Sequence, residues 1–109
     1  MAEYADFYEE RFRRNLNVYA HIRNRVERKI SQILRSPYHN TERLGAVDRR
    51  LDLRGCRSAR IDRNFRVIFV ICEECRKVKD CRYCFCEGLP ERAIVFLTFG
   101  PHKQAYQMK

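Results

Sequence analysis

Cysteine is the residue type that first suggests site chemistry in this 109-residue chain. Five of its six cysteines fall within residues 72–86, where two Cys-x2-Cys pairs are separated by five residues. Four thiolates at such spacing can surround one tetrahedral Zn²⁺ ion. The sequence therefore predicts a structural zinc site. Its ligands are Cys72, Cys75, Cys81 and Cys84, with Cys86 as an alternative fourth ligand.

Two other states of these cysteines stay open. The five-residue spacer is shorter than the spacer of common zinc ribbons. Disulfide bonds would suit an exported protein, but the acidic N-terminus has no apolar signal region, which disfavours export. Plain reduced thiols are the third alternative. Cys56 stands apart from the others beside Gly55, where we expect a small buried side chain.

Positive charge is the second chemical feature of the chain. It has 23 Lys+Arg against 14 Asp+Glu, which gives a formal net charge of +9. Residues 11–60 hold fourteen of the bases and only four acids, whereas residues 1–10 hold four acids and no base. An excess on this scale favours a polyanionic partner, above all nucleic acid, over a merely solvated surface.

Length and composition bound the class of protein. The chain is 45% hydrophobic and 34% charged, which argues against wholesale disorder, and its length favours one domain over residues 1–109. The longest apolar runs, 67–72 and 93–99, fall far short of the roughly 18 residues that span a bilayer. We therefore expect a single cytoplasmic domain with no membrane partner.

Helices are expected in the first third of the chain. Apolar residues recur every three or four positions in residues 8–19 and again in 19–34, which predicts two helices joined near residue 17. The second helix must end before Pro37, because proline disfavours helical geometry in the residue that precedes it. The polar residues 37–48 predict a connecting loop.

Strand patterns follow the helices. Apolar and charged residues alternate at 51–54 and 59–61, and residues 62–64 are typical of a turn. Residues 65–72 and 93–99 are almost continuously apolar and β-branched, as buried central strands are. Helices followed by consecutive strands predict an α+β fold, with two N-terminal helices packed on a mostly antiparallel sheet of about four strands.

A family resemblance rests mainly on one block of sequence. Residues 51–69, LDLRGCRSARIDRNFRVIF, resemble the core of the RelE/ParE superfamily, the toxins of bacterial and archaeal toxin–antitoxin pairs. The most specific part, 58–69, follows the pattern Ser-x-Arg-Ile-x-x-x-Tyr/Phe-Arg and then aliphatic and aromatic residues. The segment 99–106 supplies the Gly, His and Tyr with which the family closes. The resemblance extends over nearly the whole chain outside the cysteine-rich stretch.

The chain departs from the family pattern in two places. The family begins with a short strand, whereas residues 3–8 are too mixed to predict one. The last hairpin of the family is short, whereas here residues 72–92 separate the last two predicted strands and hold the clustered cysteines. We expect a cysteine-rich insertion at a hairpin tip, which a bound metal ion would stabilise because its binding free energy adds to folding.

The resemblance implies an endoribonuclease that cuts mRNA, in many relatives in the ribosomal A site, and that a cognate antitoxin neutralises. In this chemistry a ribose 2′-OH attacks the adjacent phosphate. The reaction needs a base, an acid and positive charge on the developing phosphorane. It needs no metal ion, so the resemblance implies no cofactor for catalysis.

Position in the family motif assigns the candidate catalytic residues. Arg66 matches the strand arginine suited to holding the scissile phosphate, and Arg60 supplies a second cation. His102 is the acid–base candidate, because a pKa of about 6.5 serves either direction of proton transfer. Tyr106 is expected to stack on the base or to share proton transfer. The predicted RNA-binding residues are Arg54, Arg57, Arg63 and Lys103.

Other roles for these residues stay open at this point. Arg66 can instead pair with Asp52 or Asp62, His102 can be an ordinary surface histidine, and Tyr106 can simply pack. ParE-type relatives share the scaffold but inhibit DNA gyrase without cleaving anything. A zinc-knuckle module that binds RNA without catalysis is a third alternative.

Overall fold

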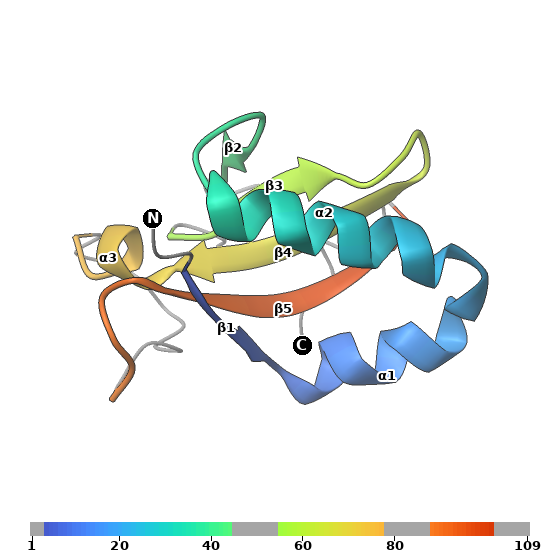
Figure 1. Ribbon diagram of the computed structural model, residues 1–109, viewed down its shortest axis with the longest axis horizontal. Coiled ribbons are helices and arrows are strands. Elements are labelled where there is room, and N and C mark those ends of the chain that lie inside the picture. Colours follow the sequence, from blue (N-terminus) through green and yellow to red (C-terminus); the bar gives the residue numbers. More distant parts are fainter. Residues whose placement is uncertain (1–3, 45–54, 78–87, 102–109) are drawn as a thin grey trace, which may run out of the picture.

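The computed structural model describes residues 4–44, 55–77 and 88–101. Figure 1 shows an α+β arrangement of helices against a sheet, as the sequence predicts. In chain order the elements are β1 (Ala5–Tyr8), α1 (Glu10–Val18), the 3₁₀ turn η1 (Ala20–Ile22), α2 (Arg23–Arg35), β2 (Glu42–Arg43), β3 (Arg57–Arg60), β4 (Phe65–Ile71), α3 (Cys72–Cys75) and β5 (Ala93–Pro101). Among these described helices, none has the length and apolar character needed to cross a membrane.

The sheet has the strand order β1-β5-β4-β3-β2. β1 runs parallel to β5, and the other neighbouring strands are antiparallel. The prediction of about four strands is therefore too low for the described chain, which has five. β1 lies in the mixed residues 3–8, and β2 is a two-residue strand inside the predicted loop 37–48. Strands this short carry no periodic signal, and only pairing with distant strands creates them. The alternating residues 51–54 lie outside the described residues.

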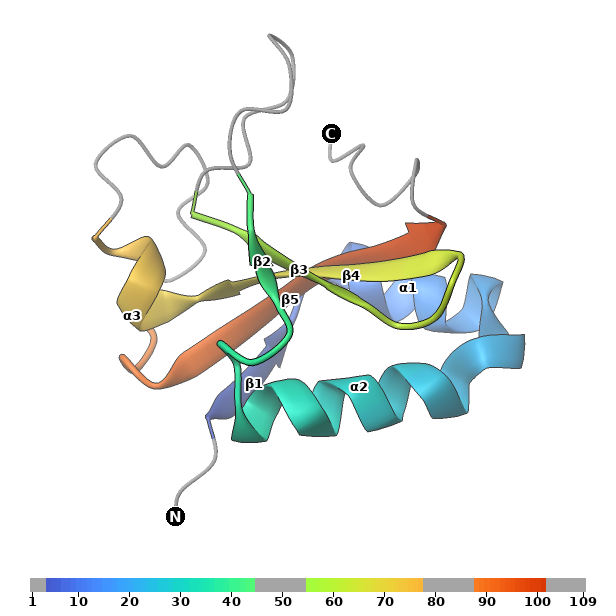
Figure 2. The same cartoon turned by 90° about the horizontal axis from the view of Figure 1, so that it is seen from above.

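The larger core cluster lies between the helices and one face of the sheet. α2 runs along this side of the sheet in Figure 2, and α1 packs beside β5 in Figure 1. Aromatic rings fill the contact between α1 and β5, where the Phe12 ring centroid lies 4.9 Å from that of Phe99 and 5.7 Å from that of Phe96. α2 contributes Val26 and Ile33, each at most 2% exposed. The two predicted helices are thus confirmed.

Alternating residues of β4 supply two different cores. Val67 and Phe69 belong to the cluster beneath the helices, whereas Ile68 and Val70 belong to a second cluster that includes α3. A strand buried on both faces needs apolar residues at every position, which explains the nearly continuous apolar run. The strand ends one residue earlier than predicted, because Cys72 begins α3.

Beyond the end of β1, the Asn15 side chain of α1 forms hydrogen bonds with the edge of β5. β1 pairs with β5 only as far as Phe96. Farther along, the Asn15 side-chain amide donates hydrogen bonds to the Phe99 carbonyl at 2.7 Å and to the Thr98 hydroxyl at 3.1 Å. These bonds satisfy polar groups that would otherwise be left unpaired at the edge of the sheet.

The turn between β3 and β4 is stabilised by Asp62, at the predicted position. Its Oδ1 accepts hydrogen bonds from the backbone N–H groups of Asn64 at 2.8 Å and Phe65 at 3.0 Å. Oδ2 forms an ion pair with Arg25 of α2 at 3.1 Å. Burial opposes ionisation of Asp62, but these donors together outweigh it and lower the pKa of the carboxyl below its ordinary value. The turn sets the register that places Arg60 opposite Arg66.

Candidate functional site

Arg66 lies on the central strand β4, opposite Arg60 of β3 and Gly100 of β5. Its Nη1 donates a hydrogen bond to the Ser58 hydroxyl at 3.1 Å and lies 3.6 Å from a carboxylate oxygen of Glu42. The Arg66 side chain is 14% exposed and that of Glu42 is 71% exposed. The Arg66 guanidinium is thus held in place by Ser58 of β3, and the exposed carboxylate of Glu42 lies close to it.

Of the two alternative partners for Arg66, Asp62 is engaged elsewhere, with Arg25. Asp52 lies outside the described residues. The neighbour that sequence reasoning missed is Glu42, which sits in the segment predicted as a loop. Its position follows from the pairing of Glu42 with Ser58 across β2 and β3, and no local pattern indicates that pairing.

The Arg66 and Glu42 side chains suit two parts of a phosphoryl-transfer reaction. A guanidinium binds phosphate oxygens and stabilises charge that develops on them. A carboxylate within reach can accept the proton of an attacking hydroxyl group. The Glu42 carboxylate forms an ion pair with the Arg66 guanidinium, so a phosphate group that binds to Arg66 has to compete with Glu42.

Arg57, predicted to bind RNA, is enclosed in the fold. Its Nε and Nη2 donate to the Glu74 carboxylate of α3 at 2.9 and 2.8 Å, and its Nη1 donates to the Thr41 hydroxyl at 3.1 Å. The guanidinium also lies 4.8 Å from the centre of the Tyr38 ring. The Arg57 side chain is only 10% exposed. Its burial and its contacts favour a structural role, in which the ion pair between Arg57 and Glu74 links β3 to α3.

Arg60 and Arg63 are exposed, as an RNA-binding role requires. Arg63 lies in the turn between β3 and β4. Arg60 is the register partner of Arg66, and it also lines a hollow that β3 forms with the basic residues of α2. Arg60 therefore stands at the border between the strand pair that holds Arg66 and the surface of α2.

Four of the predicted catalytic and RNA-binding residues lie outside the described residues, namely Arg54, His102, Lys103 and Tyr106. Three of them follow β5 in the sequence. β5 places Gly100 opposite Arg66 and ends at Pro101, directly before residue 102 in the sequence. The structure thus leaves the catalytic roles of His102 and Tyr106 as predictions.

Cys72 and Cys75 lie three residues apart on α3 and face the second core cluster, at 0% and 6% exposure. Within residues 4–44, 55–77 and 88–101, no group of three or more His, Cys, Asp or Glu side chains is arranged to hold a metal ion. Cys81, Cys84 and Cys86 lie outside the described residues. The zinc site has no support from the described part of the chain and stays a prediction. The expected burial of Cys56 is confirmed at 1% exposure.

Several solved structures resemble this chain over nearly its whole length. One match, to a chain of the RelBE2 toxin–antitoxin complex from Mycobacterium tuberculosis, has a TM-score of 0.63 and 19% identity and covers 93% of both chains. YafQ from E. coli strain BL21(DE3) matches with a TM-score of 0.63 and 11% identity, over 96% of this chain and all of that one. A chain of the E. coli DinJ–YafQ toxin–antitoxin complex gives 0.59 and 10%, over 97% and 100%.

The TM-scores and coverage show that this chain shares the fold of the matched chains of the RelBE2, YafQ and DinJ–YafQ structures. No model of a known protein family matches the sequence, and no curated protein does. The resemblance seen in residues 51–69 thus agrees with a three-dimensional likeness that extends over nearly the whole chain.

Proposed function

We propose that this protein is a toxin-type endoribonuclease that cleaves mRNA in association with the ribosome and is neutralised by a cognate antitoxin. The observation that carries the proposal is the Arg66 guanidinium, which Ser58 holds on the central strand with the Glu42 carboxylate beside it. The fold supports it, because the chains of similar structure belong to toxin–antitoxin systems.

In the proposed reaction, Arg66 binds the scissile phosphate and Ser58 keeps its guanidinium in place. The 2′-OH attacks the phosphorus, its proton passes to a base, and the new O2′–P bond forms as the P–O5′ bond breaks. The leaving 5′-oxygen takes a proton from an acid. The products are a 2′,3′-cyclic phosphate and a 5′-hydroxyl group.

Two groups divide the proton transfers. Glu42 is the described carboxylate beside Arg66, and we assign to it the proton of the 2′-OH. The family pattern implies an acid–base role for His102, and with Glu42 as the base we assign to His102 the protonation of the leaving oxygen. Arg60 adds positive charge next to Arg66, where the phosphorane develops.

The partners follow from the charge and from the fold. A basic chain with a net charge of +9 suits mRNA and the ribosome, which are both polyanionic. The same charge suits an acidic antitoxin that is partly disordered until it binds. The RelBE2 and DinJ–YafQ structures are toxin–antitoxin complexes, which supports an antitoxin partner for this chain.

Growth arrest tests the proposal. Induced expression of the wild-type chain should arrest growth, and co-expression of the antitoxin should relieve the arrest. Arg66→Ala should abolish it, whereas Arg14→Ala on the exposed surface of α1 should not. Thermal unfolding of both purified variants controls for misfolding. Arrest by a folded Arg66→Ala variant contradicts the proposal, and inhibition of gyrase supercoiling by that variant identifies a ParE-type protein instead.

A further inference from the structure

Two adjoining hollows run along α2 and together form one groove. The first hollow, of about 340 Å³, lies between α2 and the end of β3 and is lined by Arg25, Arg28, Lys29, Gln32, Arg60 and Ile61. The second, of about 510 Å³, lies between α2 and the turn that follows it. Lys29 and Gln32 line both hollows. We call this continuous surface the α2 groove.

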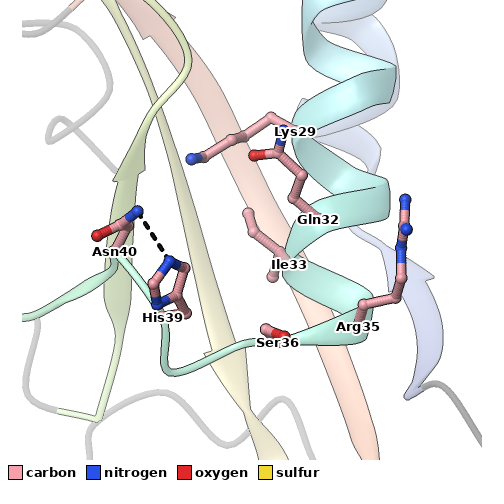
Figure 3. A pocket seen from close by; sticks show the side chains of 7 residues that line it. All are labelled: Lys29, Gln32, Ile33, Arg35, Ser36, His39 and Asn40. Atoms are coloured by element: carbon pink, nitrogen blue, oxygen red, sulfur yellow. Dashed lines mark hydrogen bonds between the residues drawn. The ribbon is translucent and has the colours of Figure 1, made fainter. Parts of the chain in front are cut away.

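The side chains of the second hollow lie as Figure 3 shows. Lys29 and Gln32 extend from α2, and His39 and Asn40 face them from the opposite wall, joined to each other by a hydrogen bond of 3.1 Å. Every one of these four side chains is polar, so the groove offers hydrogen-bonding groups on both walls.

Positive charge dominates the α2 groove. Its cations on α2 recur at positions 25, 28, 29 and 35, a spacing that keeps them on neighbouring rows of the helix over about 15 Å. Within the described part of the chain, neither Arg28 nor Lys29 forms an ion pair with a carboxylate. Arg25 is paired with Asp62, which leaves the groove with a large excess of positive charge.

The lining favours a phosphate backbone over a folded protein as the occupant. Protein interfaces depend on apolar or aromatic anchors that fill buried pockets. In the α2 groove the described apolar side chains are Ile33, which is 2% exposed and committed to the core, and Ile61, which packs against the same core. Flexible cations and amide groups are what a chain of phosphates requires.

Arg60 connects this groove with the candidate cleavage site. It lines the groove, and across the β3–β4 pair it is opposite Arg66. Along β4, Arg66 alternates with Val67 and so lies on the sheet face of Ile68 and Val70, away from α2. A strand of RNA whose scissile phosphate lies on Arg66 therefore has to turn around the end of β3 at Arg60 to enter the groove.

We propose that the α2 groove binds the backbone of the RNA that flanks the scissile phosphate, with Arg28 and Lys29 as phosphate contacts. The proposal rests on the proposed function, since it takes Arg66 as the place of the scissile phosphate. It adds a binding track on the far side of Arg60, and it predicts that affinity depends on RNA length.

The test measures binding of the purified full chain to a fluorescent single-stranded RNA 12-mer and to a trinucleotide, over a range of salt concentrations. The probe RNAs carry 2′-O-methyl groups, so they bind without being cut. The test variant is Arg28→Gln/Lys29→Gln. The matched control is Arg13→Gln/Arg14→Gln, which removes the same charge from the exposed surface of α1, outside the groove.

Loss of two phosphate contacts should lower the salt slope of 12-mer binding by about 1.4 and weaken it about 25-fold at 0.1 M salt, because each contact on a single strand contributes about 0.7. Trinucleotide binding should not change, and the control should keep near-wild-type affinity for the 12-mer. Equal losses in the test and control variants overturn the proposal. So does a test variant that binds the 12-mer normally but no longer binds the antitoxin, since the groove is then a protein interface.

The two proposals fail separately. Binding of the 12-mer through Arg28 and Lys29 by a chain that never cleaves RNA supports the groove and rejects the endoribonuclease. Cleavage that is independent of RNA length, with no effect of the test variant, rejects the groove and leaves the endoribonuclease intact.

Discussion

Removal of the Glu74 carboxylate should destabilise the protein far more than removal of an exposed carboxylate. The Arg57 guanidinium donates three hydrogen bonds of 2.8–3.1 Å to the Glu74 carboxylate, and the Glu74 and Arg57 side chains are only 15% and 10% exposed. In Glu74→Ala the guanidinium of Arg57 stays enclosed and keeps its contacts with Thr41 and the Tyr38 ring, neither of which is a counter-ion. A buried guanidinium without its counter-ion lowers the free energy of unfolding by far more than the intact ion pair contributes to it.

The size of the effect follows from burial. Removal of one partner of a buried ion pair costs about 3–5 kcal/mol, and the residual exposure here places the expected loss near the lower end, at about 3 kcal/mol. The control is Glu27→Ala, which breaks the Arg23–Glu27 pair on α2, with side chains 55% and 58% exposed. An exposed pair of this kind contributes about 0.3–0.5 kcal/mol.

Urea unfolding followed by circular dichroism measures both losses. The double variant Arg57→Met/Glu74→Ala should recover much of the stability that Glu74→Ala loses, because no unpaired charge then remains in the interior. A Glu74→Ala variant within about 0.5 kcal/mol of wild type would refute the structural role of Arg57. An Arg57→Met variant that keeps its stability but loses affinity for RNA would restore the RNA-binding role that the sequence predicts.

Three further substitutions test other parts of the structure. Asn15→Ala should lower the free energy of unfolding by about 1–3 kcal/mol, because the Phe99 carbonyl and Thr98 hydroxyl lose their donor; an unchanged urea midpoint contradicts this. Asp62 has a lowered pKa, so its contribution to stability is present above the unfolded pKa and is lost as pH falls through the folded one. Wild type should therefore lose more stability than Asp62→Asn between pH 6 and pH 3, and parallel losses would contradict the assignment. Glu42→Gln should bind RNA more tightly, because a competing anion is gone from Arg66, yet cleave about 100-fold or more slowly; tighter binding with full activity would leave Glu42 a competitor but not the base.

Sequence patterns predicted the parts of the fold that have a strong period. The helices 10–18 and 23–35 and the buried strands 65–71 and 93–101 are long enough for apolar residues to repeat on a helical face or along a doubly buried strand. The turn at Asp62 is also local, because the carboxylate accepts from N–H groups two and three residues away.

Features that depend on distant partners were not predictable in the same way. β2 exists because Glu42 and Arg43 pair with Ser58 and Arg57, and nothing in the two residues themselves indicates a strand. The same long-range pairing brings Glu42 to Arg66. Arg57 looks from its sequence like the other basic residues of the block, and only its contact with Glu74, seventeen positions away, shows that it belongs to the interior.

The most direct test of the proposed function is the chemistry of the RNA ends. Purified wild-type protein, mixed with ribosomes programmed with a defined mRNA, should produce new 5′-hydroxyl ends and matching 2′,3′-cyclic phosphates. Folded Arg66→Ala should produce neither at a comparable rate, while Arg14→Ala cleaves as wild type does. Intact mRNA in the presence of active, folded wild-type protein, or equal cleavage by Arg66→Ala, would contradict the account.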